Sequence, residues 1–342
     1  MTQTKTLPNS SAPLPLKVGL VGTGYAAKLR AETIQADQRS QLVAVVGHTP
    51  EKTEAFCQTH QTQAFKSWAE LVEHPELDLV VISTVNRDHG AIARAVLQAG
   101  KHVVVEYPLA LEVSEAEELI AFAQAQGKLL HVEHIELLGG VHQALRQALP
   151  KVGTVFYARY ATINPQHPAP PKWTYHPELF GFPLIGAISR LHRLIDLFGQ
   201  VATVSCQSRF WEAGKVSAVA GASPYQACIC HAQLQFKSGL LAEVVYAKGE
   251  TLWQAARTFE VQGDQGALIF EGENGSFVQA GQTQPLEVGG RRGLFAKDTK
   301  MVLDYLTEGT PLYLSASDSL YTLKVADAAQ RSAQTGQVVQ LQ

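Results

Sequence analysis

The first 135 residues alternate between short apolar runs and longer amphipathic stretches. The runs at 79–83 and 102–105 are apolar almost throughout, as is typical of strands in a parallel sheet covered on both faces. The stretches between such runs carry apolar residues three and four positions apart, which indicates helices. The pattern predicts strands at 17–21, 42–46, 79–83, 102–105 and 129–132, and helices at 26–36, 50–60, 67–73, 88–99 and 114–126, the last opened by a capping box of Ser114 and Glu117. This order of elements predicts a doubly wound α/β domain, whose ligand should lie at the carboxyl ends of the strands.

The pattern changes beyond residue 138, where apolar and polar residues alternate one by one. Turn sequences at 237–239 and 263–266 are rich in glycine and favour hairpins. We therefore expect a large antiparallel sheet packed on helices. The expected strands are 154–161, 203–212, 226–236, 240–247, 257–262 and 267–271, and the expected helices are 188–198, 294–307 and 317–333.

Composition narrows the class of protein. The chain has 342 residues, 46% of them hydrophobic, and a formal net charge of −3 without a basic block, so nucleic acid and anionic membranes are poor candidates for partners. Its four cysteines lack C-x-x-C spacing, which favours a cytoplasmic protein with reduced thiols. No segment is long and apolar enough to span a bilayer, and no spacing suits a metal. Residues 1–16 lack the apolar core of a signal peptide and are expected to form a flexible tail.

A glycine turn lies between the first strand and the first helix. Gly22 allows a tight turn, Gly24 lets the backbone approach a pyrophosphate, and Ala27 keeps the helix close to the sheet. The strand before it and the helix after it give the turn the context of a dinucleotide-binding fingerprint. We therefore predict a Rossmann domain at 17–135 and a substrate-binding domain at 136–342. The expected contacts to the cofactor here are Gly22, Thr23, Gly24, Tyr25 and Ala26.

The end of the second strand indicates which dinucleotide binds. NAD enzymes usually have Asp or Glu there for the ribose 2′-hydroxyl, whereas this chain has His48 and Thr49, followed by Lys52. These three groups could bind a 2′-phosphate, so we predict NADPH. In the alternative interpretation Thr49 only caps the next helix and Lys52 is solvated; for Thr49 both roles can hold.

An aromatic, proline-rich segment occupies residues 164–183. It contains six prolines together with Trp173, Tyr175, Phe180 and Phe182. It is either a lid over a flat ligand or a packed connector, and composition alone favours the connector.

Several motifs resemble the Gfo/Idh/MocA oxidoreductases over residues 18–339. They are the fingerprint, the segments 83–89 and 99–108, and the last helix. The resemblance implies a Rossmann domain followed by an α/β domain with a large sheet, and places Thr84, Asn86 and His89 near the cofactor, although His89 could be structural. Two departures matter. Tyr107 stands where the family usually has Lys, and the helix that carries the acid and base of sugar dehydrogenases has Arg190 and Leu194 at those positions.

Those departures resemble the biliverdin reductase subgroup of this family. The similar stretches are 106–109, 127–138 and 180–183 followed by 188–191. The resemblance implies NADPH-dependent reduction of biliverdin IXα to bilirubin IXα at the central methine carbon. Pigment-binding candidates are Glu133, Glu136, Trp173, Phe182 and Arg193, and cations for the propionates could be Lys172, Arg193 or Arg209.

The chemistry of that reaction suggests a role for each catalytic candidate. A cation near the pyrrole nitrogens would stabilise electron density that arrives with a hydride, and Arg190 is the obvious candidate. Guanidinium loses a proton only above about pH 12, so Arg190 would order a donor, with direct donation second. Its structural alternative is an ion pair with a carboxylate such as Asp196. Tyr107 would lie under the nicotinamide, where it could stack on the ring or bond a lactam oxygen of the pigment. Glu106 could orient the carboxamide or hold a pyrrole N–H.

Two other functions fit parts of the sequence. A sugar or inositol dehydrogenase of the same family would need the missing Lys and His. A non-catalytic NAD(P)-binding sensor would keep the fingerprint and lose the chemistry. The sequence assigns no role to His131 or His134 and leaves the oligomeric state open, with a monomer as the working expectation.

Overall fold

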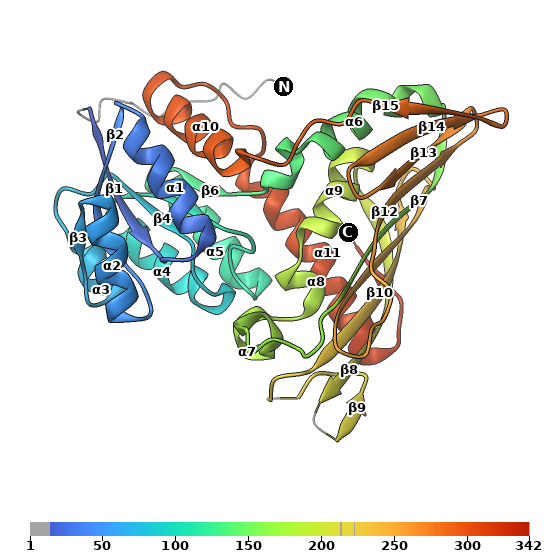
Figure 1. The fold of residues 1–342 in the computed structure, drawn as a ribbon, viewed down its shortest axis with the longest axis horizontal. Helices are drawn as coiled ribbons and strands as arrows, with labels where there is room; N and C mark the ends of the chain where they lie inside the picture. The colour runs from blue at the N-terminus through green and yellow to red at the C-terminus, as the bar shows by residue number, and fades with distance from the viewer. Residues whose placement is uncertain (1–13, 213, 222, 342) are drawn as a thin grey trace. The chain divides into compact units, whose positions relative to one another are not determined.

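The chain forms two compact units. The computed structural model describes residues 14–212, 214–221 and 223–341, so residues 1–13 of the expected tail lie outside the described residues. The first unit comprises the chain up to Ile135 together with Gly293–Leu320, and the second comprises Glu136–Arg292 and the chain from Tyr321 on. Figure 1 labels the helices and strands of both.

The first unit is built on a parallel sheet with the order β3-β2-β1-β4-β5-β6. Its elements are β1 (Leu16–Val21), α1 (Tyr25–Ala36), β2 (Ser40–Val46), α2 (Pro50–His60), β3 (Gln63–Ala64), α3 (Trp68–Val72), β4 (Leu79–Ile82), α4 (Asn86–Gln98), β5 (His102–Val105), α5 (Val113–Ala125), β6 (Leu130–Val132) and α10 (Leu294–Glu308). The predicted doubly wound domain is confirmed, and β3 was missed because two residues are too short to show a pattern.

The expected capping box at Ser114 is wrong. The N-cap of α5 is Glu112, and the helix begins at Val113. Ser114 therefore lies inside the first turn, beyond the position from which a hydroxyl caps a helix.

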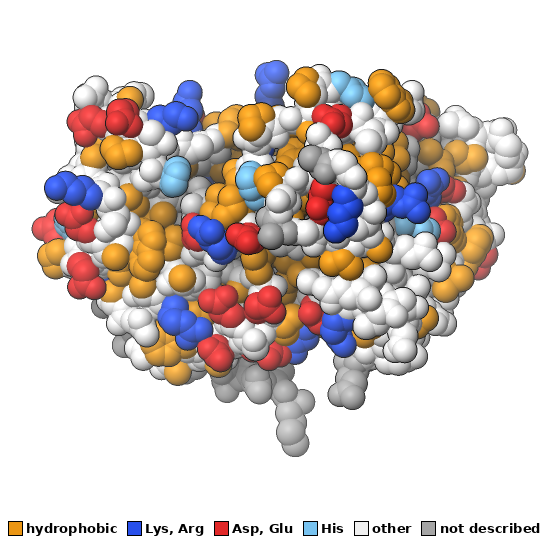
Figure 2. Space-filling view, turned by 90° about the horizontal axis from the view of Figure 1, so that it is seen from below, with side chains coloured by type: hydrophobic (Ala, Val, Ile, Leu, Met, Phe, Trp, Pro, Cys, Tyr) orange, Lys and Arg blue, Asp and Glu red, His pale blue; other side chains and the backbone are white. Residues whose placement is uncertain are grey.

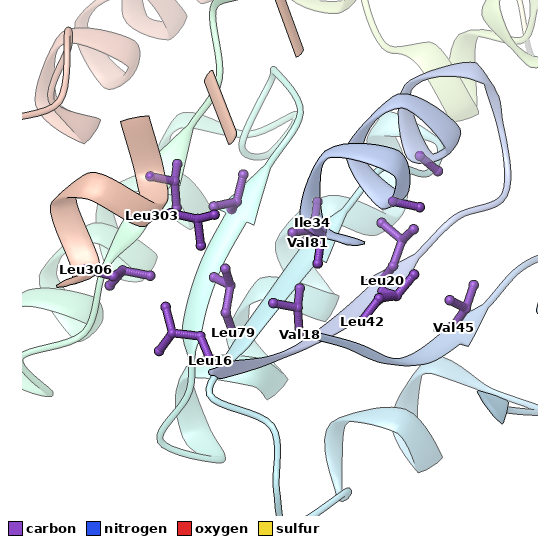
Figure 3. Close-up of a cluster of buried hydrophobic side chains, with 14 of the residues drawn as sticks. Leu16, Val18, Leu20, Ile34, Leu42, Val45, Leu79, Val81, Leu303 and Leu306 are labelled. Carbon is purple, nitrogen blue, oxygen red and sulfur yellow. The ribbon is translucent and has the colours of Figure 1, made fainter. Parts of the chain in front are cut away.

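One face of the parallel sheet carries a core that the last part of the first unit completes. Val18 and Leu20 of β1 pack with α1, and Leu303 and Leu306 of α10 join the same cluster (Figure 3). Gly19, between the two β1 residues, faces Leu71 of α3 on the other side. The sequence predicted one uninterrupted second domain from residue 136. The structure instead returns residues 293–320 to the first unit, because the apolar stripe of α10 is buried in this core.

The second unit contains a large mixed sheet with the order β15-β14-β13-β12-β7-β11-β10-β8-β16, and β9 pairs with β8. Its strands are β7 (Val155–Pro165), β8 (Val201–Glu212), β9 (Lys215–Ser217), β10 (Ala227–Phe236), β11 (Leu241–Gly249), β12 (Ala256–Gly263), β13 (Gly266–Glu271), β14 (Asn274–Gln279), β15 (Gln282–Leu286) and β16 (Val339–Gln340). Its helical elements are α6 (Gly140–Ala148), η2 (Leu149–Val152), η3 (Trp173–Tyr175), α7 (Pro177–Phe180), α8 (Pro183–Gly186) and α9 (Ser189–Phe198). Two further elements, η1 (Ile135–Leu138) and α11 (Ala316–Thr335), begin in the first unit and end in the second.

Two features of this sheet differ from the prediction. Strands β7 and β11 pair in parallel, whereas all strands were expected to be antiparallel. Parallel neighbours need a long connection, and β7 leads into the helical segments α7–α9 before the chain returns to the sheet. Strands β14 and β15 were missed because they are rich in polar residues, and β15 is also mostly exposed.

The proline-rich segment 164–183 packs within the second unit. It contains η3 and α7, and Tyr175 and Phe180 are buried. Tyr175 lies 5.6 Å from the ring of Tyr225, and Trp173 meets Phe180 edge to face. These contacts support the connector interpretation for the chain without a ligand.

The surface shows no block of one charge on the face drawn in Figure 2, where acidic and basic side chains are interspersed. Within the described ranges, none of the helices combines the length and the apolar character that crossing a bilayer requires.

Candidate active site

The glycine turn between β1 and α1 is shaped by two different requirements. Gly22 has φ +126°, and a Cβ atom there would lie 2.1 Å from the carbonyl oxygen of Ser83, so only glycine fits. Gly24 has an ordinary extended backbone, and a Cβ atom would meet no protein atom within 4 Å. Neither strain nor packing explains Gly24, which leaves the close approach of a ligand as the reason for a glycine.

Gly24 is also the N-cap of α1 and provides no side chain to cap the helix. The first backbone N–H groups of α1 are therefore available to an anion, which the helix dipole also favours. Tyr25 is exposed and lies edge to face with Phe295 of the same unit. Thr23 lies against Gly47 at the end of β2, so the predicted pyrophosphate site and the predicted ribose site adjoin.

The turn after β2 presents the groups predicted for a 2′-phosphate. His48 and Lys52 are exposed and Thr49 is half-buried. Thr49 is the N-cap of α2, as expected, but its hydroxyl makes no capping hydrogen bond. The acidic residue of this region, Glu51, lies in the first turn of α2. The turn thus offers an imidazole, a hydroxyl and an ammonium group to a phosphate.

The turn after β4 contains three more residues that were predicted to contact the cofactor, Thr84, Asn86 and His89. Asn86 and His89 are buried, while Thr84 is half-buried. His89 Nδ1 lies 2.8 Å from the carbonyl oxygen of Pro108, and Nε2 lies 3.2 Å from that of Thr84. Burial lowers the pKa of His89, and a neutral ring donates only one proton, which we assign to the shorter contact. His89 therefore fixes the backbone of two site segments, which fits its structural alternative and not a direct cofactor contact.

Glu106 directly follows β5, and protein groups already hold its carboxylate. Its Oε1 accepts hydrogen bonds from Arg30 Nε at 2.9 Å and from Ser83 Oγ at 3.4 Å. The side chain keeps 17% exposure. Glu106 is thus oriented by Arg30 of α1 and by Ser83, the residue after β4, while part of it remains open to a ligand.

A buried polar network behind Glu106 was missed by the sequence analysis. Asp298 of α10 accepts hydrogen bonds from Arg30 Nη1 at 2.8 Å and from Tyr313 Oη at 2.9 Å, and its Oδ1 lies 2.8 Å from His131 Nε2. Burial opposes ionisation of Asp298, but His131 and Arg30 outweigh it and hold its pKa well below the ordinary range. Arg30 lies on the buried stripe of α1 and Asp298 on that of α10. A charged residue within the apolar stripe of each helix was the feature of the sequence that could have indicated this network.

Tyr107 lies on a support of aromatic and polar groups. Its ring stacks on His134, with centroids 5.2 Å apart and planes at 14°. The backbone N–H of His134 donates to Tyr313 Oη, and His134 Nε2 lies 3.0 Å from Ser319 Oγ. Glu133 is 1% exposed and accepts a hydrogen bond from the N–H of Ile135. That burial does not fit the pigment contact predicted for Glu133.

The second unit contains a cavity of about 420 Å³ that brings two predicted residues together. Arg190 and Glu136 line it, together with Tyr160 and Thr162 of β7 and two further arginines, Arg257 and Arg291. Trp173 and Phe182 are half-buried elsewhere in the unit. Arg193 is buried, lies over the ring of Tyr160 and donates to the carbonyl oxygen of Glu136. These three, with Lys172 and Arg209, are not among the residues that line this cavity.

Arg190 does not pair with Asp196, the carboxylate offered as an example for its structural alternative. Its guanidinium lies over the Tyr246 ring at 5.4 Å, and Nη1 donates to Ser189 Oγ at 2.9 Å. Asp196 bonds instead to His142 and Arg146. Positions 190 and 196 are on different faces of α9. Six residues at about 100° each turn the helix by about 600°, which leaves the two side chains about 120° apart.

A buried lysine beside this region also escaped the sequence analysis. Lys248 of β11 is 5% exposed, and its Nζ donates to the carbonyl oxygen of Thr174. The ammonium lies 4.1 Å from the ring centroid of Phe180 and 4.6 Å from that of Tyr175. Burial lowers the pKa of Lys248 to about 8. Lys248 thus ties the 164–183 segment to the sheet.

Both parts of the chain match models of one enzyme family. Residues 16–134 match the oxidoreductase family with an NAD-binding Rossmann fold, and residues 147–341 match its C-terminal alpha/beta domain. The chain therefore belongs to the Gfo/Idh/MocA oxidoreductase family.

Within that family the chain is similar to biliverdin reductases. It is 53% identical to a biliverdin reductase from Synechocystis sp. PCC 6803, whose crystal structure contains biliverdin and NADP+, with a TM-score of 0.90 over 93% of this chain and 99% of that one. It is 30% identical to biliverdin reductase A of Mus musculus over 188 residues and 35% identical to that of Homo sapiens over 130 residues. These two matches span 60% and 41% of the mouse and human proteins, and 55% and 38% of this chain.

Proposed function

We propose that this protein catalyses the NADPH-dependent reduction of biliverdin IXα to bilirubin IXα. The observation that carries the proposal is the 53% identity, over almost the whole of both chains, to a biliverdin reductase crystallised with biliverdin and NADP+. The chemistry of the site residues agrees with it, because the reaction adds a hydride to a conjugated pigment and needs no base to remove a hydroxyl proton.

The first unit would hold the cofactor. Gly24 leaves room beside the first N–H groups of α1 for a pyrophosphate. His48, Thr49 and Lys52 would bind the 2′-phosphate through charge-assisted hydrogen bonds. When bound, NADPH supplies the hydride. Glu106 is held by Arg30 and Ser83 and would orient the carboxamide, while Tyr107, supported by His134, would provide a flat surface beside the nicotinamide.

Arg190 would act on the pigment. Reduction places a hydride on the central methine carbon and a proton on a pyrrole nitrogen, so negative charge builds up on the conjugated system during the transfer. A fixed cation lowers the energy of that charge. The guanidinium of Arg190 lies over Tyr246 and bonds Ser189, which fixes its position. Since guanidinium stays protonated below about pH 12, Arg190 orders the water or pyrrolic N–H that donates the proton.

A sugar dehydrogenase is disfavoured by α9. Leu194 stands where such enzymes have their histidine, and its side chain is fully buried at 0% exposure. Arg190 stands at the position of the acid. Because its guanidinium is already protonated, it could not remove the hydroxyl proton of a sugar.

The experiment compares turnover of biliverdin and the dissociation constant of NADPH for three variants. Arg190→Ala should lower turnover about 100-fold or more, the usual effect of losing one oriented donor, and leave NADPH binding nearly unchanged. Arg190→Lys should recover only part, because an ammonium lacks the planar fork. Arg159→Ala is the matched control, since Arg159 is an exposed arginine of β7 whose only recorded ion pair among the described residues is a 3.9 Å contact to Glu243. A folded Arg190→Ala variant with normal turnover would make Arg190 structural.

A further inference from the structure

The cavity in the second unit has an excess of positive charge. It is lined by Arg190 of α9, Arg257 of β12 and Arg291 from the segment after β15. Among the described residues that line it, Glu136 alone is acidic. Its volume of about 420 Å³ is more than a carboxylate group needs, so an anionic arm of a larger ligand could enter it.

Two of the three arginines, Arg257 and Arg291, have no ion-pair partner among the described residues. Burial lowers the pKa of Arg257, and the positive charges of Arg291, Arg193 and Arg190 lower it further. Three arginines that share one carboxylate, Glu136, repel one another, and an anion from outside would relieve that repulsion.

A hydroxyl on the neighbouring strand points to the same kind of ligand. Thr162 of β7 and Arg257 of β12 are direct partners in the antiparallel register, so their side chains stand side by side on one face of the sheet. Thr162 is 9% exposed, and its Oγ1 is buried without a hydrogen-bond partner among the described residues. A buried hydroxyl without a partner is unfavourable, and a carboxylate oxygen in the cavity would accept its hydrogen bond.

We propose that this cavity is a carboxylate subsite that binds a propionate of the tetrapyrrole through Arg257 and Arg291, with the Thr162 hydroxyl as a third donor. The assignment rests on the proposed function for the identity of the ligand. The guanidinium fork matches a carboxylate in two parallel hydrogen bonds, and a propionate carries its carboxylate on a short flexible arm. Arg190 forms part of the same wall, so a propionate held here would position the pigment beside the residue proposed to stabilise its charge. In this proposal Arg257, Arg291 and Thr162 bind the carboxylate, whereas Arg190 stabilises the charge that hydride transfer places on the pigment.

The test is a cycle of enzyme and substrate changes. We compare kcat/KM for biliverdin with kcat/KM for biliverdin dimethyl ester, which has the same conjugated system without the carboxylates. The wild-type enzyme should prefer the free acid about 10- to 100-fold, the range expected for hydrogen bonds to a charged group. Arg257→Ala and Arg291→Ala should each lose about tenfold on the free acid, mainly through KM, and almost nothing on the ester. Arg257→Lys should retain part of the preference.

Arg159→Ala is the matched control in this cycle too. Arg159 lies on β7 next to Tyr160, and successive residues of a strand point to opposite faces, so the control changes an exposed arginine outside the cavity. It should keep the wild-type preference for the free acid. Arg291 is exposed, so Arg291→Ala keeps the test valid if Arg257→Ala fails to fold.

Two results would overturn the subsite. A loss of equal size on acid and ester in the arginine variants would mean that these side chains do not read the carboxylate. An unchanged kcat/KM of both arginine variants for the free acid would mean that the propionate binds elsewhere. If the wild-type protein reduces neither pigment, the proposed function fails instead, and equilibrium titration of both pigments still decides the subsite. Equal affinities of the wild-type protein for acid and ester in that titration would refute it.

Discussion

Asp298→Asn removes the charge at the centre of the buried network in the first unit. Asp298 is 0% exposed and bonds to Arg30 at 2.8 Å and to Tyr313 at 2.9 Å. Removing one partner of a buried ion pair costs about 3–5 kcal/mol, because the other charge stays buried. Arg30 keeps its 2.9 Å bond to Glu106 in the variant, so we expect the lower end, about 3 kcal/mol of unfolding free energy.

Urea unfolding followed by circular dichroism measures this loss. The matched control is Asp327→Asn, because Asp327 pairs with Arg331 one helical turn away on an exposed face and such pairs contribute about 0.5 kcal/mol. The folded state lowers the pKa of Asp298, so its contribution is present above the ordinary carboxyl pKa and is lost as the pH falls below about 4. The difference between wild type and variant should therefore shrink below that pH. A loss under about 1 kcal/mol at pH 7, or a difference that grows on acidification, would refute the reasoning.

Three further predictions concern the cofactor and the pigment. His48→Asp should reverse or abolish a preference for NADPH over NADH, since a carboxylate repels the 2′-phosphate; steady-state kinetics with both cofactors measures it. Tyr107→Phe should lower turnover only modestly, because stacking on His134 positions the ring without its hydroxyl. Hydrogen exchange in residues 164–183 should slow when biliverdin binds, because the segment would order over the pigment.

Each of these has a clear contrary outcome. Equal use of NADH and NADPH by the unmodified protein would remove the argument from His48. A loss of a thousandfold or more in Tyr107→Phe, about 4 kcal/mol, would make the hydroxyl a direct participant. Unchanged exchange in residues 164–183 would leave that segment as a connector, the interpretation that its contacts with Tyr225 already support.

Local sequence patterns predicted the helices and strands better than they predicted which of these elements pack or pair with one another. The apolar runs at β4 and β5 identified buried parallel strands, because burial on both faces leaves a direct mark on composition. The parallel pairing of β7 with β11 and the return of α10 to the first unit depend on contacts between distant residues. A pattern within a short stretch of sequence contains no information about such contacts.

The same limit applies to the site. The turn at Gly22 and Gly24 could be predicted because strand, turn and helix are consecutive in the chain. Arg30 and Asp298 are 268 residues apart, so only the buried charge on each helix was visible, not the bond between them. Arg257 looks like any strand arginine in the sequence, and only the sheet register places it beside Thr162.

The most direct test of the central claim follows the hydride itself. The purified protein is incubated with biliverdin IXα and NADPH in which both hydrogens at C4 of the nicotinamide are deuterium, and the yellow product is analysed by mass spectrometry and NMR. The proposed function predicts one equivalent of NADP+ and bilirubin IXα with a single deuterium on its central methylene carbon. A green pigment that persists, or a reduced pigment without deuterium at that carbon, would contradict it.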